Sequence, residues 1–168
     1  MRLVINRTLP CASAIALVLT CSCLLAADLE KKGHFSGTHT WYAVGKAAEI
    51  EKNHWFWTGE FSGVFLNDAG SGFLHLASVA CPAMNDIQPD GSNFAHGYCI
   101  VTDNSGDKVY TAWKCKGRMG DQCVGDGHFI GGTGKYAGIK GDNKFSSRGI
   151  ASTSSGYAVW TDATWELP

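Results

Sequence analysis

The sequence predicts an all-β domain of about eight strands, and three observations carry that prediction. Glycine supplies 21 of the 168 residues, proline only 4, and aromatic residues 11%. Short runs alternate apolar with polar residues and are separated by residues that favour tight turns. The sequence shows neither a long amphipathic helix nor a βαβ rhythm. Periodicity alone leaves an up-and-down barrel and a β-sandwich open.

The composition also excludes several classes of protein. Charged residues make up only 17% of the chain, whereas a disordered chain needs high charge and few aromatics. The glycines follow no three-residue period, which excludes collagen, and no heptads run through the sequence. With a net charge of −1, nothing favours a nucleic acid or an anionic membrane as a partner.

Residues 1–27 have the layout of a secretory signal peptide. Two arginines near the start precede an uncharged apolar centre, and small residues lead to the acidic Asp28. We expect cleavage to leave residues 28–168 as a single secreted or periplasmic domain with no membrane attachment. An uncleaved membrane anchor, or a lipoprotein attached through Cys21 or Cys23, is the alternative interpretation.

Four cysteines remain after the predicted cleavage, and an even number in an exported protein favours two disulfides. Cys115 and Cys123 enclose a short polar loop that contains glycine, so we expect them to staple a hairpin. Cys81 and Cys99 would then close a longer loop. The sequence has no CxxC motif and no histidine at ligand spacing beside a cysteine, so it predicts no metal and no other cofactor.

The first two strands are expected at residues 39–50 and 54–66. The first begins with clear alternation, although residues 44–52 are also compatible with one helical turn. The second is rich in aromatics and places Trp55 and Trp57 on one face, opposite Phe56.

A turn and a longer connection flank the next predicted strand. Residues 67–72 are rich in Asn, Asp and Gly, which tolerate a positive φ, and a third strand is expected at residues 73–80. Residues 82–93 contain two prolines and a glycine, and we expect them to form a long connection to a fourth strand at residues 94–102.

The C-terminal half predicts four further strands. The hairpin turn at residues 103–107 leads into an alternating fifth strand at residues 108–115. Further alternating runs predict strands at residues 124–130, 143–152 and 157–167.

Residues 129–141 carry a glycine cluster that favours the barrel over the sandwich. A strand runs into Gly131-Gly132-Thr133-Gly134, and a lysine and Tyr136 follow. This segment resembles the GGTG-x-aromatic turn of the allene oxide cyclase-like and dirigent-like barrels. The resemblance implies a closed, calycin-like barrel of eight antiparallel strands. The glycines would let the chain reverse at a rim, and Tyr136 would plug that end of the core.

The same resemblance implies two kinds of activity. The plant cyclases use a buried glutamate, polar ligands of the epoxide and a tight apolar cavity, whereas dirigent proteins use charged pocket residues to steer a reactive intermediate. None of these residues can be matched to a position of this sequence. The resemblance therefore implies an isomerase (cyclase) or a steering protein, without naming its site.

Glu60 is the candidate for a catalytic acid or base. Inside an apolar barrel its pKa would rise, as general acid–base catalysis requires. Strand parity instead places Glu60 beside Phe56 and Ser62, on the face opposite Trp55, and favours an exposed side chain. A bulge at Gly59 would reverse that parity.

The candidates for ligand binding are Trp55, Trp57, His75 and Trp113. Large aromatic walls with a few polar groups are typical of sites for apolar or ring-shaped molecules. The alternative role for these side chains is simply to fill the core. We expect a barrel that binds a small apolar or aromatic molecule rather than an enzyme. The alternatives are a cyclase or steering protein, and a surface interaction protein that uses the connection at residues 82–93.

Overall fold

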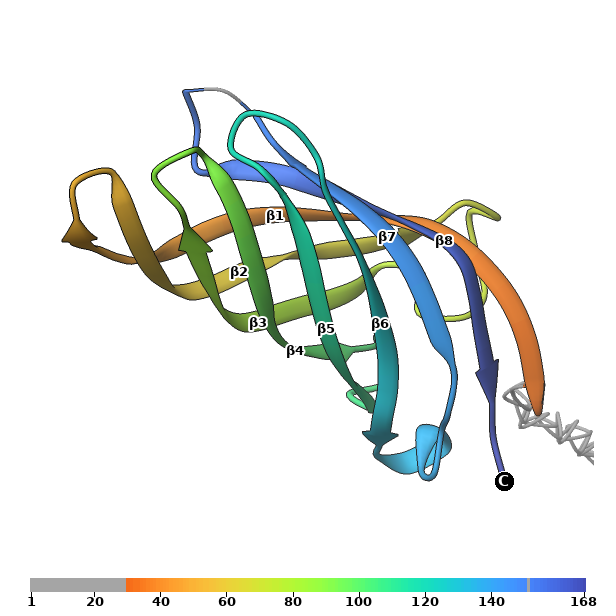
Figure 1. Ribbon diagram of the computed structural model, residues 1–168. Helices are drawn as coiled ribbons and strands as arrows, with labels where there is room; N and C mark the ends of the chain where they lie inside the picture. The colour runs from red at the N-terminus through yellow and green to blue at the C-terminus, as the bar shows by residue number, and fades with distance from the viewer. Residues whose placement is uncertain (1–29, 151) are drawn as a thin grey trace, which may run out of the picture.

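The computed structural model describes residues 30–150 and 152–168, which form one closed barrel of eight antiparallel strands (Figure 1). Each strand pairs with its neighbours in chain order, and β8 closes on β1. The barrel prediction is confirmed and the sandwich is wrong. The predicted signal peptide and its cleavage site lie outside the described residues. The elements are β1 (Lys32–Glu51), β2 (His54–Asn67), β3 (Ala77–Ile87), β4 (Ser92–Thr102), β5 (Lys108–Arg118), β6 (Cys123–Gly132), the 3₁₀-helix η1 (Gly134–Tyr136), β7 (Asp142–Gly149) and β8 (Ser155–Glu166).

The helical content of the described chain is small. No helix within residues 30–150 and 152–168 is long and apolar enough to cross a membrane. The segment that could have formed a helical turn continues β1 as a strand to Glu51.

A bulge in β8 adjusts which side chains enter the barrel. Along β1 the inward residues alternate, and Phe35 pairs with Ala163 while Gly37 pairs with Trp160. β8 therefore has one extra residue between Trp160 and Ala163, and Asp162 in this interval has a φ of 49°. Because the bulge shifts the parity by one residue, both Trp160 and Ala163 are buried inside.

The 3₁₀-helix η1 and the C-terminus lie at the same end of the barrel (Figure 1). Aromatic rings fill this end. The ring of Phe73 stacks on that of Trp165 at a centroid distance of 4.8 Å and meets Tyr136 edge-on at 5.8 Å. Tyr136 is only 2% exposed, so it plugs this end as the glycine cluster predicted. We call this end the closed end.

A polar contact holds the plug in place. The hydroxyl of Tyr136 donates a hydrogen bond to Asp103 Oδ2 at 3.0 Å, and Lys135 forms an ion pair with the same carboxylate. Burial opposes the charge on Asp103, but hydrogen bonds from Lys135, Ser105 and Tyr136 outweigh it and hold the pKa of this carboxyl well below its usual range. The loop between β4 and β5 is thereby tied to η1.

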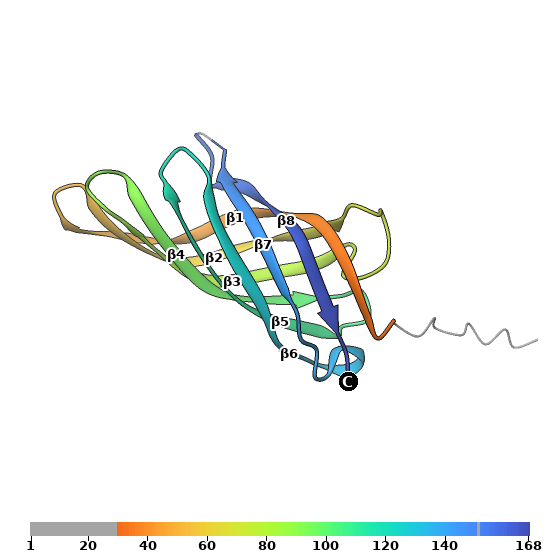
Figure 2. The ribbon, with the colours of Figure 1, turned by 45° about the vertical axis from the view of Figure 1, so that its right-hand side comes forward.

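The opposite end of the barrel carries four hairpins and forms the mouth (Figure 2). The β1–β2 hairpin projects furthest (Figure 2), and the pairing of β8 with β1 ends at Tyr42. Residues 43–51 of β1 extend past β8 and pair with β2.

Residues 73–76 are turns rather than the start of a strand, and β3 begins at Ala77. Leu74 and Leu76 adopt left-handed conformations with φ of 54° and 59°. Leu74 is buried with the closed-end cluster, so tertiary packing overrides the strand propensity of this apolar run. The predicted strand at residues 73–80 is therefore wrong in its first half.

Residues 82–93 are not a long connection. They complete β3 and begin β4, and only residues 88–91 form the turn between them. The β3–β4 pairing is interrupted at Pro82, which has no backbone N–H to donate. The Cys81–Cys99 disulfide joins the two strands at this interruption. This result removes the exposed loop on which the surface interaction hypothesis relied.

Replacing Tyr136 by alanine should destabilise the protein by about 3–5 kcal/mol, because it removes a buried aromatic ring from the plug. The matched change Tyr157→Ala, at a half-exposed position near the mouth, should cost about 1 kcal/mol or less. Urea denaturation followed by circular dichroism measures both. Equal midpoints for the two variants would contradict the assignment of Tyr136 as the plug.

Candidate functional site

The mouth half of the barrel contains a cavity of about 800 Å³. Its floor is formed by the buried residues His39, Thr111 and Trp160, and Trp160 packs against Phe35 and Phe65 of the core. Its rim includes residues 118–121 of the β5–β6 turn and Trp55 of the β1–β2 hairpin. The volume is within the range that proteins use to bind small organic molecules.

Tryptophan rings lie against glycines on the cavity wall. Gly45 and Gly59 pair directly across β1 and β2, and a Cβ on either would lie 2.5 Å from the ring of Trp57. A Cβ on Gly156 would likewise collide with the ring of Trp41. Because the rings occupy the space that side chains would otherwise fill, they pack on the wall and leave the lumen open.

Five aromatic rings that contact one another in series line this cavity. The ring of Phe61 lies 4.9 Å from that of Trp57, 5.1 Å from that of Trp41 and 6.2 Å from that of Trp113, measured between centroids. Trp113 in turn meets Phe145 edge-on at 6.0 Å. We call these five residues the aromatic wall. Such a surface favours a ligand with a large apolar or aromatic body.

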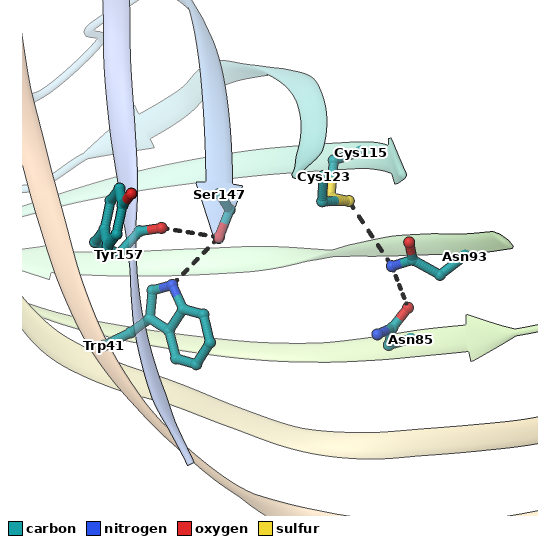
Figure 3. Close-up of a disulfide and its surroundings, with 7 residues drawn as sticks. All are labelled: Trp41, Asn85, Asn93, Cys115, Cys123, Ser147 and Tyr157. Atoms are coloured by element: carbon teal, nitrogen blue, oxygen red, sulfur yellow. Dashed lines mark hydrogen bonds between the residues drawn. A yellow bond between two sulfur atoms is a disulfide. The ribbon is translucent and has the colours of Figure 1, made fainter. Parts of the chain in front are cut away.

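Both disulfides form part of the cavity wall. Cys81 pairs with Cys99 between β3 and β4, and Cys115 pairs with Cys123 across the β5–β6 hairpin. This pairing confirms the one expected from the sequence. All four cysteines line the cavity, and Asn93 Nδ2 approaches Cys123 Sγ at 3.9 Å (Figure 3). The cross-links therefore fix the shape of the cavity as well as the barrel.

Three of the residues that line the cavity have a buried polar atom without a hydrogen-bond partner among residues 30–150 and 152–168. These atoms are His39 Nε2, Trp113 Nε1 and Asn93 Oδ1. The amide nitrogen of Asn93 donates to Asn85 Oδ1 at 3.0 Å, which leaves its oxygen as the unpaired atom (Figure 3). Buried polar atoms in proteins are almost always paired, so these three mark the cavity as a candidate binding site.

The indole N–H of Trp41, unlike that of Trp113, has a hydrogen-bond partner in the described chain. Its Nε1 donates to Ser147 Oγ at 3.2 Å, and this hydroxyl donates to the backbone carbonyl of Tyr157 at 3.2 Å (Figure 3). The N–H of Trp41 is therefore satisfied within the protein, although its ring lines the same cavity.

His39 is held uncharged by its surroundings. The residue is 4% exposed, and burial lowers its pKa from 6.5 to about 4. Among the charged residues of the described chain, those that line the cavity are Arg118, Asp121 and Arg148, at the turns of the mouth. The cavity is thus charged at its rim and neutral at its floor.

The structure brings three of the four sequence candidates together. Trp55, Trp57 and Trp113 all line the cavity. His75 does not, because it lies in the turn before β3 at the closed end. Glu60 is exposed on the outer face of β2, where its carboxylate accepts a hydrogen bond from Ser62. The cavity therefore offers no role to either of these two side chains.

Sequence reasoning missed His39 and Asn93. His39 shares strand parity with Trp41, which also lines the cavity, and this parity could have identified it. Asn93 was missed because residues 82–93 were predicted to be a connection, whereas β4 begins at Ser92. The part of the chain that the structure describes has no group of three His, Cys, Asp or Glu side chains placed to hold a metal ion.

The sequence matches no protein-family model, and no curated protein matches it either. A solved structure does resemble it, that of a pterocarpan synthase dirigent protein. The alignment covers 94% of this chain and 98% of that chain, with a TM-score of 0.53 and 10% sequence identity. The chain has a dirigent-like barrel fold. At this identity the likeness concerns the fold, and the cavity residues of this chain must be interpreted by themselves.

The neutral His39 makes the stability of the barrel depend on pH. The unfolded histidine binds a proton near pH 6.5, but the folded one does so only near pH 4. Between these values the unfolded state holds more protons, so stability falls as the pH is lowered, by up to about 3 kcal/mol. The variant His39→Phe should lose less stability between pH 7 and pH 4 in urea denaturation.

The control is His128→Phe, which removes an exposed histidine from β6. This variant should keep the pH dependence of the wild type. A pH dependence of the same size in His39→Phe would show that His39 is not buried as a neutral group.

Proposed function

We propose that this protein is an exported barrel that binds a small apolar or aromatic molecule in its cavity. The observation that carries the proposal is the aromatic wall around an open lumen of about 800 Å³. A barrel of eight strands can be filled by its own side chains or can leave room for one small ligand. Here Trp57 and Trp41 pack on glycines of the wall, and the barrel leaves room for a ligand.

The proposal that the protein is exported has two supports. Residues 1–27 have the layout of a signal peptide, and the folded domain contains two disulfides. Disulfides persist in extracellular and periplasmic environments and are rare in the cytosol. We propose that the mature protein starts at Asp28.

A second candidate function is that of a cyclase or a dirigent-like steering protein. The observation that favours it is a hydrogen-bonding side chain, His39, at the floor of an open cavity. Such a group could orient a reactive molecule while the aromatic wall restricts its conformation. Binding alone ranks first, because Glu60, the carboxylate considered for catalysis, lies on the outer face.

A phenylalanine ring placed inside the cavity should weaken ligand binding. Ala43 lines the cavity, whereas the exposed Ala48 of the same strand does not, so Ala43→Phe and Ala48→Phe add the same ring to opposite faces. Titration with fatty acids and aromatic hydrocarbons, followed by tryptophan fluorescence, should give saturable binding for the wild type. We expect Ala43→Phe to weaken it about tenfold or more and Ala48→Phe to leave it unchanged. An absence of saturable binding in every class would contradict the proposed function.

Expression in a secreting host tests export separately. The intact mass of the secreted protein should correspond to residues 28–168 with both disulfides formed. A mass that retains residues 1–27, or a product confined to the cytosol, would contradict export.

A further inference from the structure

The unpaired polar atoms of the cavity indicate what kind of molecule enters it. His39 Nε2 and Trp113 Nε1 are both buried, and neither has a hydrogen-bond partner within residues 30–150 and 152–168. Both residues line the cavity, one from β1 and the other from β5. A buried polar atom without a partner destabilises a protein, whereas the same atom contributes affinity when a ligand supplies the complementary donor or acceptor.

The indole N–H of Trp113 sets one requirement. An indole nitrogen can donate a hydrogen bond but cannot accept one, so the matching ligand atom must be an acceptor. Trp41 lines the same cavity but already donates to Ser147, so it places no such demand on the ligand.

His39 sets a second requirement, which concerns charge. Burial keeps its imidazole neutral, with one ring nitrogen that donates and one that accepts. The cationic side chains among the lining residues of the described chain are Arg118 and Arg148, which lie at the mouth. A carboxylate that reached the floor would lose its hydration without meeting a cation.

We propose that the ligand is an uncharged molecule with an apolar, ring-sized body and a carbonyl or hydroxyl oxygen. The body packs on the aromatic wall, and the oxygen pairs with the indole N–H of Trp113 and the imidazole of His39. Asn93 Oδ1, which has no partner in the described chain, favours an additional donor on the ligand, such as a hydroxyl. This inference rests on the proposed binding function and adds the polarity of the ligand to it.

Four rigid tricyclic probes of nearly equal size test the inference: fluorene, 9-fluorenol, 9-fluorenone and fluorene-9-carboxylate. Their dissociation constants are measured at pH 7.4 with the full oxidised protein, by calorimetry and by quenching of tryptophan fluorescence. We expect the alcohol and the ketone to bind about tenfold more tightly than the hydrocarbon. The carboxylate should bind about tenfold more weakly than the alcohol.

Variants assign this preference to particular atoms. Trp113→Phe keeps an aromatic ring but removes the unpaired N–H, and it should reduce the preference for the ketone over fluorene to about threefold or less. His39→Phe should do the same and provides a second, independent variant. Trp165→Phe makes the same exchange at the closed end, outside the cavity, and it should keep the full preference.

The possible results separate the inference from the function on which it rests. If fluorene binds as tightly as the ketone and the alcohol, or if the preference survives both Trp113→Phe and His39→Phe, the inference is wrong and the binding function stands. Binding of the carboxylate as tight as that of the alcohol would also overturn it. If none of the four probes binds, the inference is wrong, and the titration with fatty acids and aromatic hydrocarbons decides separately whether the binding function stands.

Discussion

Tryptophan rings packed on glycine keep the mouth half of this barrel hollow. Gly45 and Gly59 face each other across β1 and β2, and the ring of Trp57 lies where their side chains would be. Trp41 is placed in the same way over Gly156. Large rings usually fill the interior of a small barrel, but here the glycines allow them to lie along its wall. The presence of a cavity, and therefore any binding function, depends on this arrangement.

The packed core of the closed end and the two disulfides compensate for the stability that the hollow mouth half does not provide. The tightly packed aromatics around Phe73 and Tyr136 provide the core that the mouth half lacks. The two disulfides join neighbouring strands beside the cavity, and each contributes about 2–4 kcal/mol by restricting the unfolded chain. One half of the barrel thus supplies stability, while the other is free to present unpaired polar groups such as Trp113 Nε1, which has no partner in the described chain.

The local patterns in the sequence were sufficient for the number and order of the strands. Alternation identified most of them, the cysteine spacing favoured the observed pairing among three possible ones, and the glycine cluster indicated closure and the buried Tyr136. Local patterns failed where a distant contact decides the conformation. Leu74 lies in a turn because its side chain packs into the core at the closed end. Pro82 remains in a strand because it pairs with β2 on the side away from β4. The bulge at Asp162 follows from the closure of β8 on β1.

Local sequence patterns were also insufficient to predict the cavity. Parity separated the inward tryptophans from Glu60, but it does not show how far along the barrel the packed core ends. That boundary leaves His39 at the floor of a cavity instead of inside the core, and it is set by the closure of the whole sheet. Sequence patterns therefore indicated an aromatic interior without revealing that it is hollow or which polar atoms remain unpaired.

An electron-density map of the oxidised protein under xenon pressure tests the central claim most directly. The account predicts xenon atoms in an apolar cavity beside Trp57 and Phe61, with the ring of Trp57 lying over Gly45 and Gly59. Density that shows the ring of Trp57 turned into the lumen, with no xenon bound there, would contradict it.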